Sequence, residues 1–575
     1  MGKSIIFEEK SKKVPKGVLK GYSAVARTLL YNRGFTDERE VEDLLKGNYE
    51  EGTHDPYLML GMDVAVERIV KALKNDEKIA IFSDYDADGV PGAVVLREFL
   101  EKIGFSNIES YIPHRGIEGF GLNNTAIAEL KDKGVTLLIT VDCGIADIEE
   151  VSYAQSEGID VIISDHHISP EEPPPAIAIL NPKQPSCKYP FDELCGAGVV
   201  YKLVQALIAH EEVSFSIGQE KWLLDLVGIA TLADMVPLVD ENRIFARYGL
   251  LVLNKGRRLG LRELLSQAKV DYRTISEDDV SFTIAPRINA ASRMSHPDIA
   301  FGLLFAKTRK EAMEQAAKLE EINKERKTLV ARIAKEVKKK FADRKPGPVL
   351  VTGNPRWKPG ILGLIANSLS DSFERPAFVW GREGESGSIK GSVRSDGIMN
   401  VVEIMKSLPE ETFINYGGHA FSGGFSIELE KVHSLEGLLN DAARTTKETD
   451  EEELSSAKRY FDMSVKSEEI ESGLFEEVLS LSPFGVGFEK PIFKIEDVEV
   501  VSVKEFGKDK NHLGIDFKGK NGKVFNAIGF FMTKDSFSLD IEPGKTITIY
   551  GALEKSFFRG RAEYRVRIEH LEEHI

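Results

Sequence analysis

Over the first third of the chain, short apolar runs are separated at regular intervals by stretches that mix apolar and polar residues. Short apolar runs occupy residues 79–82, 137–141, 161–164 and 176–180. Between them, stretches such as residues 92–104 and 148–158 space their apolar residues at the helical period. Strand, helix and strand at this spacing predict a parallel α/β sheet, in which ligands bind at the carboxyl ends of the strands.

The first three apolar runs each end in side chains that can bind a cation. These are Asp84, Asp86 and Asp88 after the first run, Asp142 after the second, and Asp165, His166 and His167 after the third. A single Asp at such a position is also typical of a helix N-cap. Several carboxylates at one sheet edge, however, repel one another and raise each other's pKa values unless cations bind between them. The pattern therefore predicts a metal site at this edge.

The ligand types indicate which metal binds. Carboxylates with one or two imidazoles and no thiolate suit Mg²⁺ or Mn²⁺ better than a structural zinc ion. One bridging carboxylate can hold two ions about 3.5–4 Å apart, and such a pair activates water and stabilises both oxygens of an in-line phosphoryl displacement. We interpret the alternating aspartates as the first half of a two-metal site.

The apolar pattern changes twice in the later part of the chain. Residues 1–305 hold an N-terminal segment and the α/β catalytic domain, and an apolar stripe then predicts a connecting helix over residues 306–341. A smaller α/β domain is expected over residues 342–430, followed by a linker region at 431–485. Alternating apolar residues with Gly-rich turns predict a β-barrel over residues 486–575.

Composition limits the class of protein. A chain of 575 residues with 42% hydrophobic content exceeds what one core usually supports. It has no long apolar span, no export signal at its start and only 3 cysteines, so we expect a reduced, cytoplasmic protein without a membrane partner. The net charge of -17 is summed over the whole chain, so it does not exclude local basic clusters. Such clusters begin at Asn254, Lys324 and Lys555, although each is also typical of a solvated charged face.

Four motifs together resemble a known superfamily. "SDYDADG", "TVDCG", "ISDHH" and "GIATLADMVPL" with Asp234 resemble the successive metal-binding motifs of the DHH phosphoesterase superfamily. "YIPHRGIEGFGLN", "APRINAASRM" and "NYGGHAFSGGF" resemble its bacterial exonuclease branch, and the segment after "PFGVGFEKPIF" is similar to that branch's oligonucleotide-binding (OB-fold) barrel. The resemblance extends from Ala26 to the C-terminus and implies that the smaller α/β domain is a DHHA1 domain.

The resemblance implies a single-strand-specific exonuclease that degrades DNA from the 5′ end to mononucleotides in repair and recombination. Two Mn²⁺ or Mg²⁺ ions would be the cofactors. Asp142 would bridge both ions, with the remaining ligands being Asp84, Asp86, Asp88, His166 and Asp234. His167 would act at the scissile phosphate and Asp165 would orient the histidine pair, although purely structural support is the alternative for both.

The resemblance also implies substrate contacts, because the rigid arginine fork binds phosphate oxygens and glycine backbone approaches them closely. The candidates are Arg115, Arg287, Asn289, Arg293, Ser392, Arg394, Ser395, Gly417, Gly418 and His419. A tight turn is the alternative for the "GGH" segment. The chain departs from the usual pattern at Ser292, Lys358, Pro359 and Phe488, and none of these is a predicted metal ligand.

Two other functions fit parts of the sequence. "DADGV" after a strand resembles the nucleophile motif of haloacid-dehalogenase-type phosphatases, but the "DHH" triplet has no role there. A non-catalytic scaffold that only binds single strands is the other alternative. For the exonuclease we expect a monomer that binds the 5′ end of single-stranded DNA, with a single-strand-binding protein and a helicase as candidate partners.

Overall fold

The structure, a computed structural model, describes residues 7–10, 13–342, 346–382, 388–448, 459–507, 510–558 and 561–573. The chain forms two compact units, described separately below. One contains Asp55–Asp234 and Tyr248–Ser455, and the other contains Met1–His54, Met235–Arg247 and Ser456–Ile575. Over the described ranges, no helix combines the length and the apolar character needed to cross a lipid bilayer.

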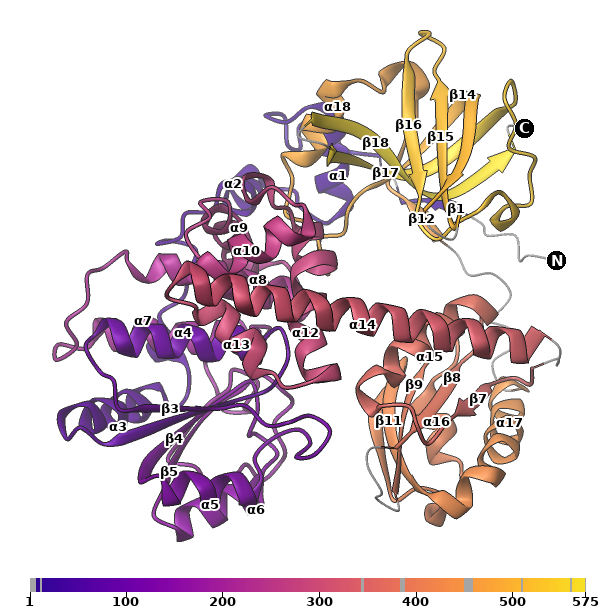
Figure 1. Cartoon of the computed structure of the whole chain (residues 1–575). Helices are drawn as coiled ribbons and strands as arrows, with labels where there is room; N and C mark the ends of the chain where they lie inside the picture. Colours follow the sequence, from indigo (N-terminus) through magenta and orange to yellow (C-terminus); the bar gives the residue numbers. More distant parts are fainter. Residues whose placement is uncertain are drawn as a thin grey trace. The chain divides into compact units, whose positions relative to one another are not determined.

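The apolar runs of the first third form the predicted parallel sheet, with strand order β3-β2-β4-β5-β6 (Figure 1). The elements of this domain are α3 (Met62–Lys74), β2 (Lys78–Ser83), α4 (Gly89–Lys102), β3 (Ile108–Tyr111), α5 (Asn124–Asp132), β4 (Val135–Val141), α6 (Ile148–Ser156), β5 (Asp160–Ser164), β6 (Ala178–Leu180), α7 (Gly196–Ala209) and α8 (Leu224–Ala233). Ala80 and Phe82 pack with residues of α5 and α6 on one face of the sheet. Ile79 and Ile81 alternate with them and point to the opposite face, where α4 contacts β2. Helices on both faces keep the strands buried.

A set of helices follows the sheet and leads to the second domain. They are α9 (Asp240–Leu253), α10 (Leu259–Ala268), α11 (Glu277–Asp279), a π-helical turn (Val280–Ile284), α12 (Ala285–Met294), α13 (Asp298–Phe305) and α14 (Arg309–Ala342). The 34-residue α14 buries Ala312, Ala316 and Leu319 in its first half. Its last turns bury Ile333 and Val337 against the next domain. One apolar stripe thus packs against both domains of this unit.

The second domain is a five-stranded mixed sheet of order β10-β11-β9-β8-β7. Its elements are β7 (Leu350–Gly353), α15 (Pro359–Phe373), β8 (Ala377–Gly381), β9 (Ser388–Arg394), α16 (Val401–Lys406), β10 (Asn415–His419), β11 (Ser422–Glu428) and α17 (Val432–Glu448). β7 and β8 pair in parallel. The glycine-rich β10 and β11 form an antiparallel hairpin beside β9. Helix α15 covers one face with α14, and α16 and α17 cover the other.

The other unit is built around a closed barrel, which confirms the predicted fold class. Its elements are β1 (Phe7–Glu9), α1 (Ala24–Asn32), α2 (Glu38–Lys46), β12 (Arg459–Phe461), β13 (Met463–Lys466), α18 (Ser472–Leu479), β14 (Ile492–Phe506), β15 (His512–Lys518), β16 (Val524–Gly529), β17 (Thr546–Phe558) and β18 (Arg561–Glu573). The strand order β14-β15-β16-β18-β17 closes through the pairing of β17 with β14. This is the connectivity of an OB-fold barrel.

The N-terminal residues belong to the barrel unit, although the sequence analysis grouped them with the catalytic sheet in residues 1–305. β1 pairs in parallel with β12, and Arg33 forms an ion pair with Asp462 at 3.0 Å. These partners lie more than 400 residues apart in the chain, so no local pattern reveals them. The expected linker region at 431–485 likewise contains α17, β12, β13 and α18.

The core of the second domain gives a stability prediction. Ile365 on α15 is fully buried, so Ile365→Ala should leave a cavity and lower the free energy of unfolding by about 2–5 kcal/mol, measured by urea denaturation. Ile217→Ala is the matched control, because this side chain is 89% exposed and its loss should change stability by about 0.5 kcal/mol or less. Equal effects of the two substitutions would contradict the assigned core.

Candidate metal centre and phosphate pocket

Three neighbouring strands deliver carboxylates to one edge of the parallel sheet. Asp84, Asp142 and Asp165 directly follow β2, β4 and β5. Each continues the sheet ladder by one residue, because their backbone N–H groups donate to Val141, Ser164 and Leu180 oxygens at 3.1, 2.9 and 3.0 Å. Parallel strands end at the same edge, so residues about 80 positions apart in sequence become neighbours.

Backbone N–H groups hold the other two aspartates of the first motif. Asp86 accepts hydrogen bonds from the backbone of Asp88 and Gly89 at 2.8 and 3.2 Å. Asp88 accepts hydrogen bonds from the first two backbone N–H groups of α7, from Gly196 N at 2.6 Å and from Ala197 N at 2.7 Å. These N–H groups point out of the helix start and suit a negative charge. Neither contact was predicted from the sequence, where the small residues of "CGAG" are the signal for them.

Asp165 fixes the orientation of the histidine pair. One of its oxygens accepts hydrogen bonds from the backbone of His166 and His167 at 2.7 and 3.1 Å and from His167 Nδ1–H at 2.7 Å. Burial alone would lower the pKa of His167, but the bond to Asp165 raises it to about 9. Burial, and next the charge of His167, lowers the pKa of His166 to about 4. His166 is therefore a neutral imidazole, the form that binds metal.

The carboxylates and imidazoles form overlapping groups that could hold metal ions. Within each group the ligand atoms lie within 4.8 Å of one another: Asp84, Asp86 and Asp142; Asp142, His166 and His167; and Asp88, His166 and Asp234. His166 Nε2 lies 3.2 Å from Asp142 Oδ1, 3.7 Å from Asp234 Oδ2 and 3.8 Å from Asp88 Oδ2. Asp142 thus belongs to two groups, as a bridging ligand would. All six predicted metal ligands lie in this one cluster.

The electrostatics of the cluster fit divalent cations. Burial, and then the charge of neighbouring aspartates, raises the pKa of Asp88 to about 7 and that of Asp234 to about 8. The same causes raise the pKa of Asp142 well above its usual range. Among the described residues, Asp84 Oδ1, Asp142 Oδ1 and His166 Nδ1 are buried without a hydrogen-bond partner. Unpartnered oxygens among like charges suit Mn²⁺ or Mg²⁺.

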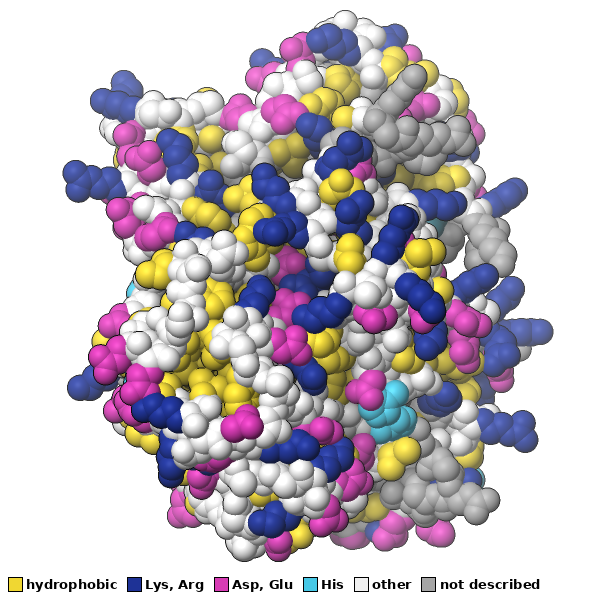
Figure 2. Space-filling view, turned by 60° about the vertical axis from the view of Figure 1, so that its left-hand side comes forward, with side chains coloured by type: hydrophobic (Ala, Val, Ile, Leu, Met, Phe, Trp, Pro, Cys, Tyr) yellow, Lys and Arg dark blue, Asp and Glu magenta, His cyan; other side chains and the backbone are white. Residues whose placement is uncertain are grey.

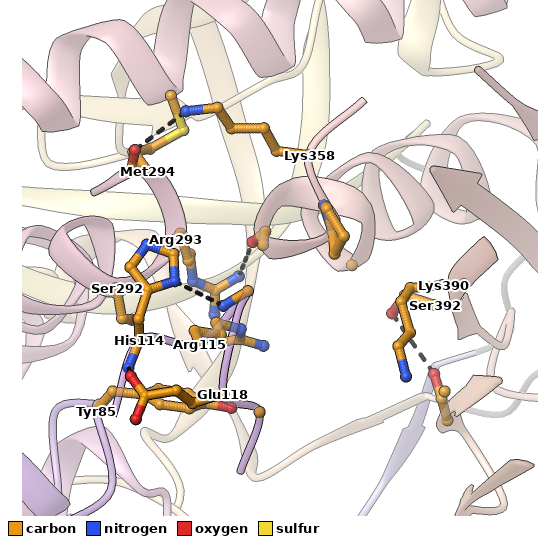
Figure 3. A pocket seen from close by; sticks show the side chains of 18 of the residues that line it. Tyr85, His114, Arg115, Glu118, Ser292, Arg293, Met294, Lys358, Lys390 and Ser392 are labelled. Atoms are coloured by element: carbon orange, nitrogen blue, oxygen red, sulfur yellow. Dashed lines mark hydrogen bonds between the residues drawn. The ribbon is translucent and has the colours of Figure 1, made fainter. Parts of the chain in front are cut away.

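A cavity of about 640 Å³ opens beside Tyr85, between the catalytic sheet and the second domain (Figure 3). Seven of the predicted substrate residues line it: Arg115, Arg293, Ser392, Arg394, Gly417, Gly418 and His419. His114, Lys358 and Lys390 line it as well and add nitrogen donors that the sequence analysis did not assign to substrate. Lys358, a departure from the usual pattern, donates to Met294 O at 3.2 Å across this cavity wall.

The arginines of the cavity lie close enough to repel one another. Burial, and next the charges of Arg115 and Arg326, lowers the pKa of Arg293 to about 10. Burial and Arg115 also lower the pKa of Arg394. Arg115 lies over the ring of Tyr85, with 5.0 Å from its guanidinium carbon to the ring centroid. Clustered guanidinium groups favour a polyanionic ligand such as phosphate.

Glycines let the backbone of the β10–β11 hairpin reach the cavity. Gly418 has φ 139°, and an added Cβ there would lie 2.3 Å from Ser422 O. Gly363 on α15 faces Arg394 Nη2 and Ser392 Oγ, at 3.1 and 3.2 Å from the position of a Cβ. A side chain at Gly363 would fill the space beside Arg394, and one at Gly418 would clash with the backbone of β11. Glycine at both positions therefore keeps this wall of the cavity open to a ligand.

Three predicted substrate residues are engaged elsewhere. Arg287 is buried and pairs with Glu320 of α14 at 2.7 Å. Asn289 Oδ1 accepts from the backbone of Ala87 at 2.9 Å, so it supports the first aspartate motif. Ser395 donates to Met399 O at 2.5 Å and does not line the cavity.

Basic and acidic side chains are interspersed on the surface shown in Figure 2, in spite of the net charge of -17. Two of the three basic clusters have internal partners. Arg258 is buried between Asp225 and Glu98, both at 2.7 Å. In the barrel, Arg565 and Arg567 pair with Glu554 at 3.3 and 3.1 Å. The side chains of Phe557 and Phe558, in the cluster that begins at Lys555, lie outside the described residues.

Family models match most of the chain. Residues 78–231 match the DHH family, N-terminal domain, residues 347–445 match the DHHA1 domain, and residues 461–570 match the RecJ OB domain. These matches coincide with the parallel sheet, the second domain and the barrel unit's C-terminal part.

Curated relatives and a solved structure share this arrangement. The single-stranded-DNA-specific exonuclease RecJ of Bacillus subtilis is 36% identical over 94% of this chain and 67% of that protein. RecJ of Haemophilus influenzae is 30% identical over 98% of both chains. The crystal structure of RecJ in complex with Mn²⁺ from Thermus thermophilus superposes with a TM-score of 0.77 at 24% identity, covering 96% of this chain and 76% of that one, and supports the fold.

The contact between Gly196 and Asp142 gives a test of the metal centre. A Cβ on Gly196 would lie 2.5 Å from Asp142 Cβ, so Gly196→Ala should displace this carboxylate and weaken Mn²⁺ binding by about 10- to 100-fold in titration calorimetry. Gly198→Ala on the same helix is the matched control, because its nearest neighbour is 3.5 Å away. Unchanged Mn²⁺ affinity in Gly196→Ala would contradict the role of Asp142.

Proposed function

Because this chain belongs to the RecJ family of single-stranded-DNA-specific exonucleases, we propose that it hydrolyses single-stranded DNA from the 5′ end and releases mononucleotides. It is a metal-dependent nuclease, with Mn²⁺ or Mg²⁺ as cofactor. The observation that carries the proposal is the cluster of overlapping ligand groups, two of which share Asp142 and two of which share His166, beside an arginine-lined cavity. The metal groups provide hydrolysis, and the cavity provides binding of a terminal phosphate.

We propose that Asp84, Asp86 and Asp142 hold one ion and that Asp88, Asp142, His166 and Asp234 hold the other. When bound, such a pair supplies Lewis acidity and a water of lowered pKa. The protein keeps the ligands in place through backbone donors, with Asp88 held by α7 and Asp86 by its own turn. Asn289 anchors the same loop through Ala87, so its proposed role is to position the metal ligands.

His167 is the proposed catalytic side chain of the histidine pair. Asp165 accepts a hydrogen bond from the Nδ1–H of His167, so Nε2 of the same ring takes no part in that bond. The His167 side chain is exposed beside the proposed metal ligands. From this position His167 can donate a hydrogen bond to the scissile phosphate or a proton to the leaving oxygen. Asp165 is a positioning residue, because its hydrogen bonds fix the ring that acts.

The cavity is the proposed site of the 5′-terminal phosphate. Arg115, Arg293 and Arg394 provide charge, and Ser392 adds a hydroxyl within 3.2 Å of Arg394 Nη1. The glycine hairpin admits the phosphate close to the backbone. A terminal phosphate carries more negative charge than an internal phosphodiester, so this arrangement favours the end of a strand over its interior.

The alternatives fit the geometry less well. A haloacid-dehalogenase-type phosphatase uses one aspartate as nucleophile and leaves His166 and His167 without a role, yet both lie in the metal-ligand groups. Such an enzyme would also form an aspartyl phosphate that acid quenching can trap. A non-catalytic scaffold does not need six converging ligands, and turnover of DNA would exclude it.

The cellular setting is part of the proposal. We propose that the enzyme acts as a cytoplasmic monomer in DNA repair and recombination. A helicase would supply unpaired DNA, and a single-strand-binding protein would cover it. This setting is supported by the fact that an exonuclease of this class requires a free single-stranded end.

Removal of one charge from the bridging ligand tests hydrolysis. Asp142→Asn keeps the shape of the side chain, and we expect Mn²⁺-dependent release of nucleotides from single-stranded DNA to fall by about 10²–10³-fold or more. Asp132→Asn, on an exposed turn of α5, is the control and should retain activity. Strands labelled at the 5′ or the 3′ end are compared under Mn²⁺; release of the 3′ label first would contradict the proposed polarity.

Arg394 allows a separate test of the cavity. Arg394→Ala should raise KM about 10- to 100-fold for strands with a 5′-phosphate and change it little for strands with a 5′-hydroxyl, because only the former place a terminal phosphate beside it. Arg444→Ala is the control, because this arginine has an exposed side chain on α17. Equal losses on both substrates would show that the cavity does not read the terminal phosphate.

A further inference from the structure

Four aromatic rings gather at one end of the barrel. Phe506 ends β14 and pairs in register with His512, the first residue of β15, and their ring centroids are 5.3 Å apart. Phe530 and Phe531 directly follow β16, the next strand. The His512 ring lies 5.7 Å from Phe530 and 5.0 Å from Phe531, edge to face in both cases. The cluster lies entirely within the barrel unit.

Phe531 is held in a position that the core of the barrel does not explain. Its side chain is 82% exposed, although a phenylalanine at a surface leaves much apolar area in water. Its backbone has φ 56°, a left-handed conformation that bulky residues rarely adopt. Its N–H donates to His512 Nδ1 at 3.0 Å, which fixes the turn. Strained backbone of this kind is concentrated at ligand-binding positions.

The neighbouring Phe530 is also accessible, with 39% exposure. The guanidinium of Arg565 lies 5.5 Å from its ring centroid and is itself paired with Glu554. On the other side, the backbone N–H of Lys534 donates to Glu505 at 3.0 Å. Acidic and basic groups therefore both flank the cluster, and its distinguishing property is exposed ring surface rather than net charge.

The position of the cluster on the barrel indicates the ligand. In the strand order of an OB fold, β14, β15 and β16 are the first three strands, so the four rings lie at the first loop and at the end of the third strand. OB folds bind oligonucleotides on the second and third strands and on the first loop. Aromatic rings there accept any base by stacking.

We propose that Phe531 and Phe530, supported by His512 and Phe506, form a stacking site for unpaired bases of the single strand that the enzyme degrades. The site differs from the basic cluster that begins at Lys555, whose arginines Arg565 and Arg567 pair with Glu554. The inference rests on the proposed function, because it assigns the barrel the same strand. A stacking site predicts that the affinity for single-stranded DNA depends on the bases that bind there rather than on the phosphates.

Equilibrium binding of the full chain in EDTA, which prevents cleavage, tests this site. Wild-type protein should bind a dT oligonucleotide more tightly than an abasic strand of equal length. Phe531→Ala should weaken dT binding by about 5- to 150-fold, leave abasic binding unchanged, and keep the same salt dependence. Tyr460→Ala is the matched control, since this tyrosine is 47% exposed in the same unit but lies on β12.

Two further outcomes separate this inference from the proposed function. Phe531→Trp should restore dT binding, and its fluorescence should be quenched by dT, which excludes misfolding as the cause of the loss in Phe531→Ala. Unchanged dT binding by Phe531→Ala, or equal losses on dT and abasic strands, would overturn the stacking site while Mn²⁺-dependent nuclease activity persists. Absence of any nuclease activity in the wild-type protein would instead overturn the proposed function.

Discussion

Repulsion among buried carboxylates is the constraint on which the catalytic half of this protein depends. Asp84, Asp88 and Asp142 are almost fully buried at one sheet edge, and burial together with their neighbours raises the pKa of each. Such a cluster is unfavourable until cations neutralise it. The fold maintains it because the large apolar core of the sheet, packed between two helix layers, stabilises the edge where the carboxylates must meet.

The chain offsets part of this repulsion with backbone dipoles. The start of α7 donates two N–H groups to Asp88, and Asp165 accepts three hydrogen bonds from the histidine pair and a fourth from the backbone of Ile145. Asp142 adopts a left-handed backbone at φ 60°, a conformation that aspartate tolerates better than most residues. Gly196 opposite it has no room for a side chain. Conformational strain and a missing Cβ thus position Asp142.

An opposite charge imbalance exists in the neighbouring cavity. Arg115, Arg293 and Arg394 converge there, and their proximity together with burial lowers the pKa of Arg293 to about 10. Carboxylates repel at the sheet edge and guanidinium groups repel in the cavity, so each region gains stability from a ligand of the other sign. Metal ions and a phosphorylated strand are such ligands, and the α14 stripe that packs on both domains keeps the two regions in one unit.

Strand periodicity alone predicts the chemistry of the candidate metal centre, because it places polar residues after apolar runs at a common edge. Asp84, Asp86, Asp142 and His166 could be named for this reason. Contacts between residues distant in sequence appear only in the folded structure. They include the N–H groups of α7 that donate to Asp88, the pairing of Arg287 with Glu320, and the grouping of residues 1–54 with the barrel. The tertiary structure also decided that Phe488, a departure from the usual pattern, is buried under Arg243, and that Phe531 is exposed. Local patterns encode which residues share a face, whereas partners distant in sequence are chosen only when the elements pack.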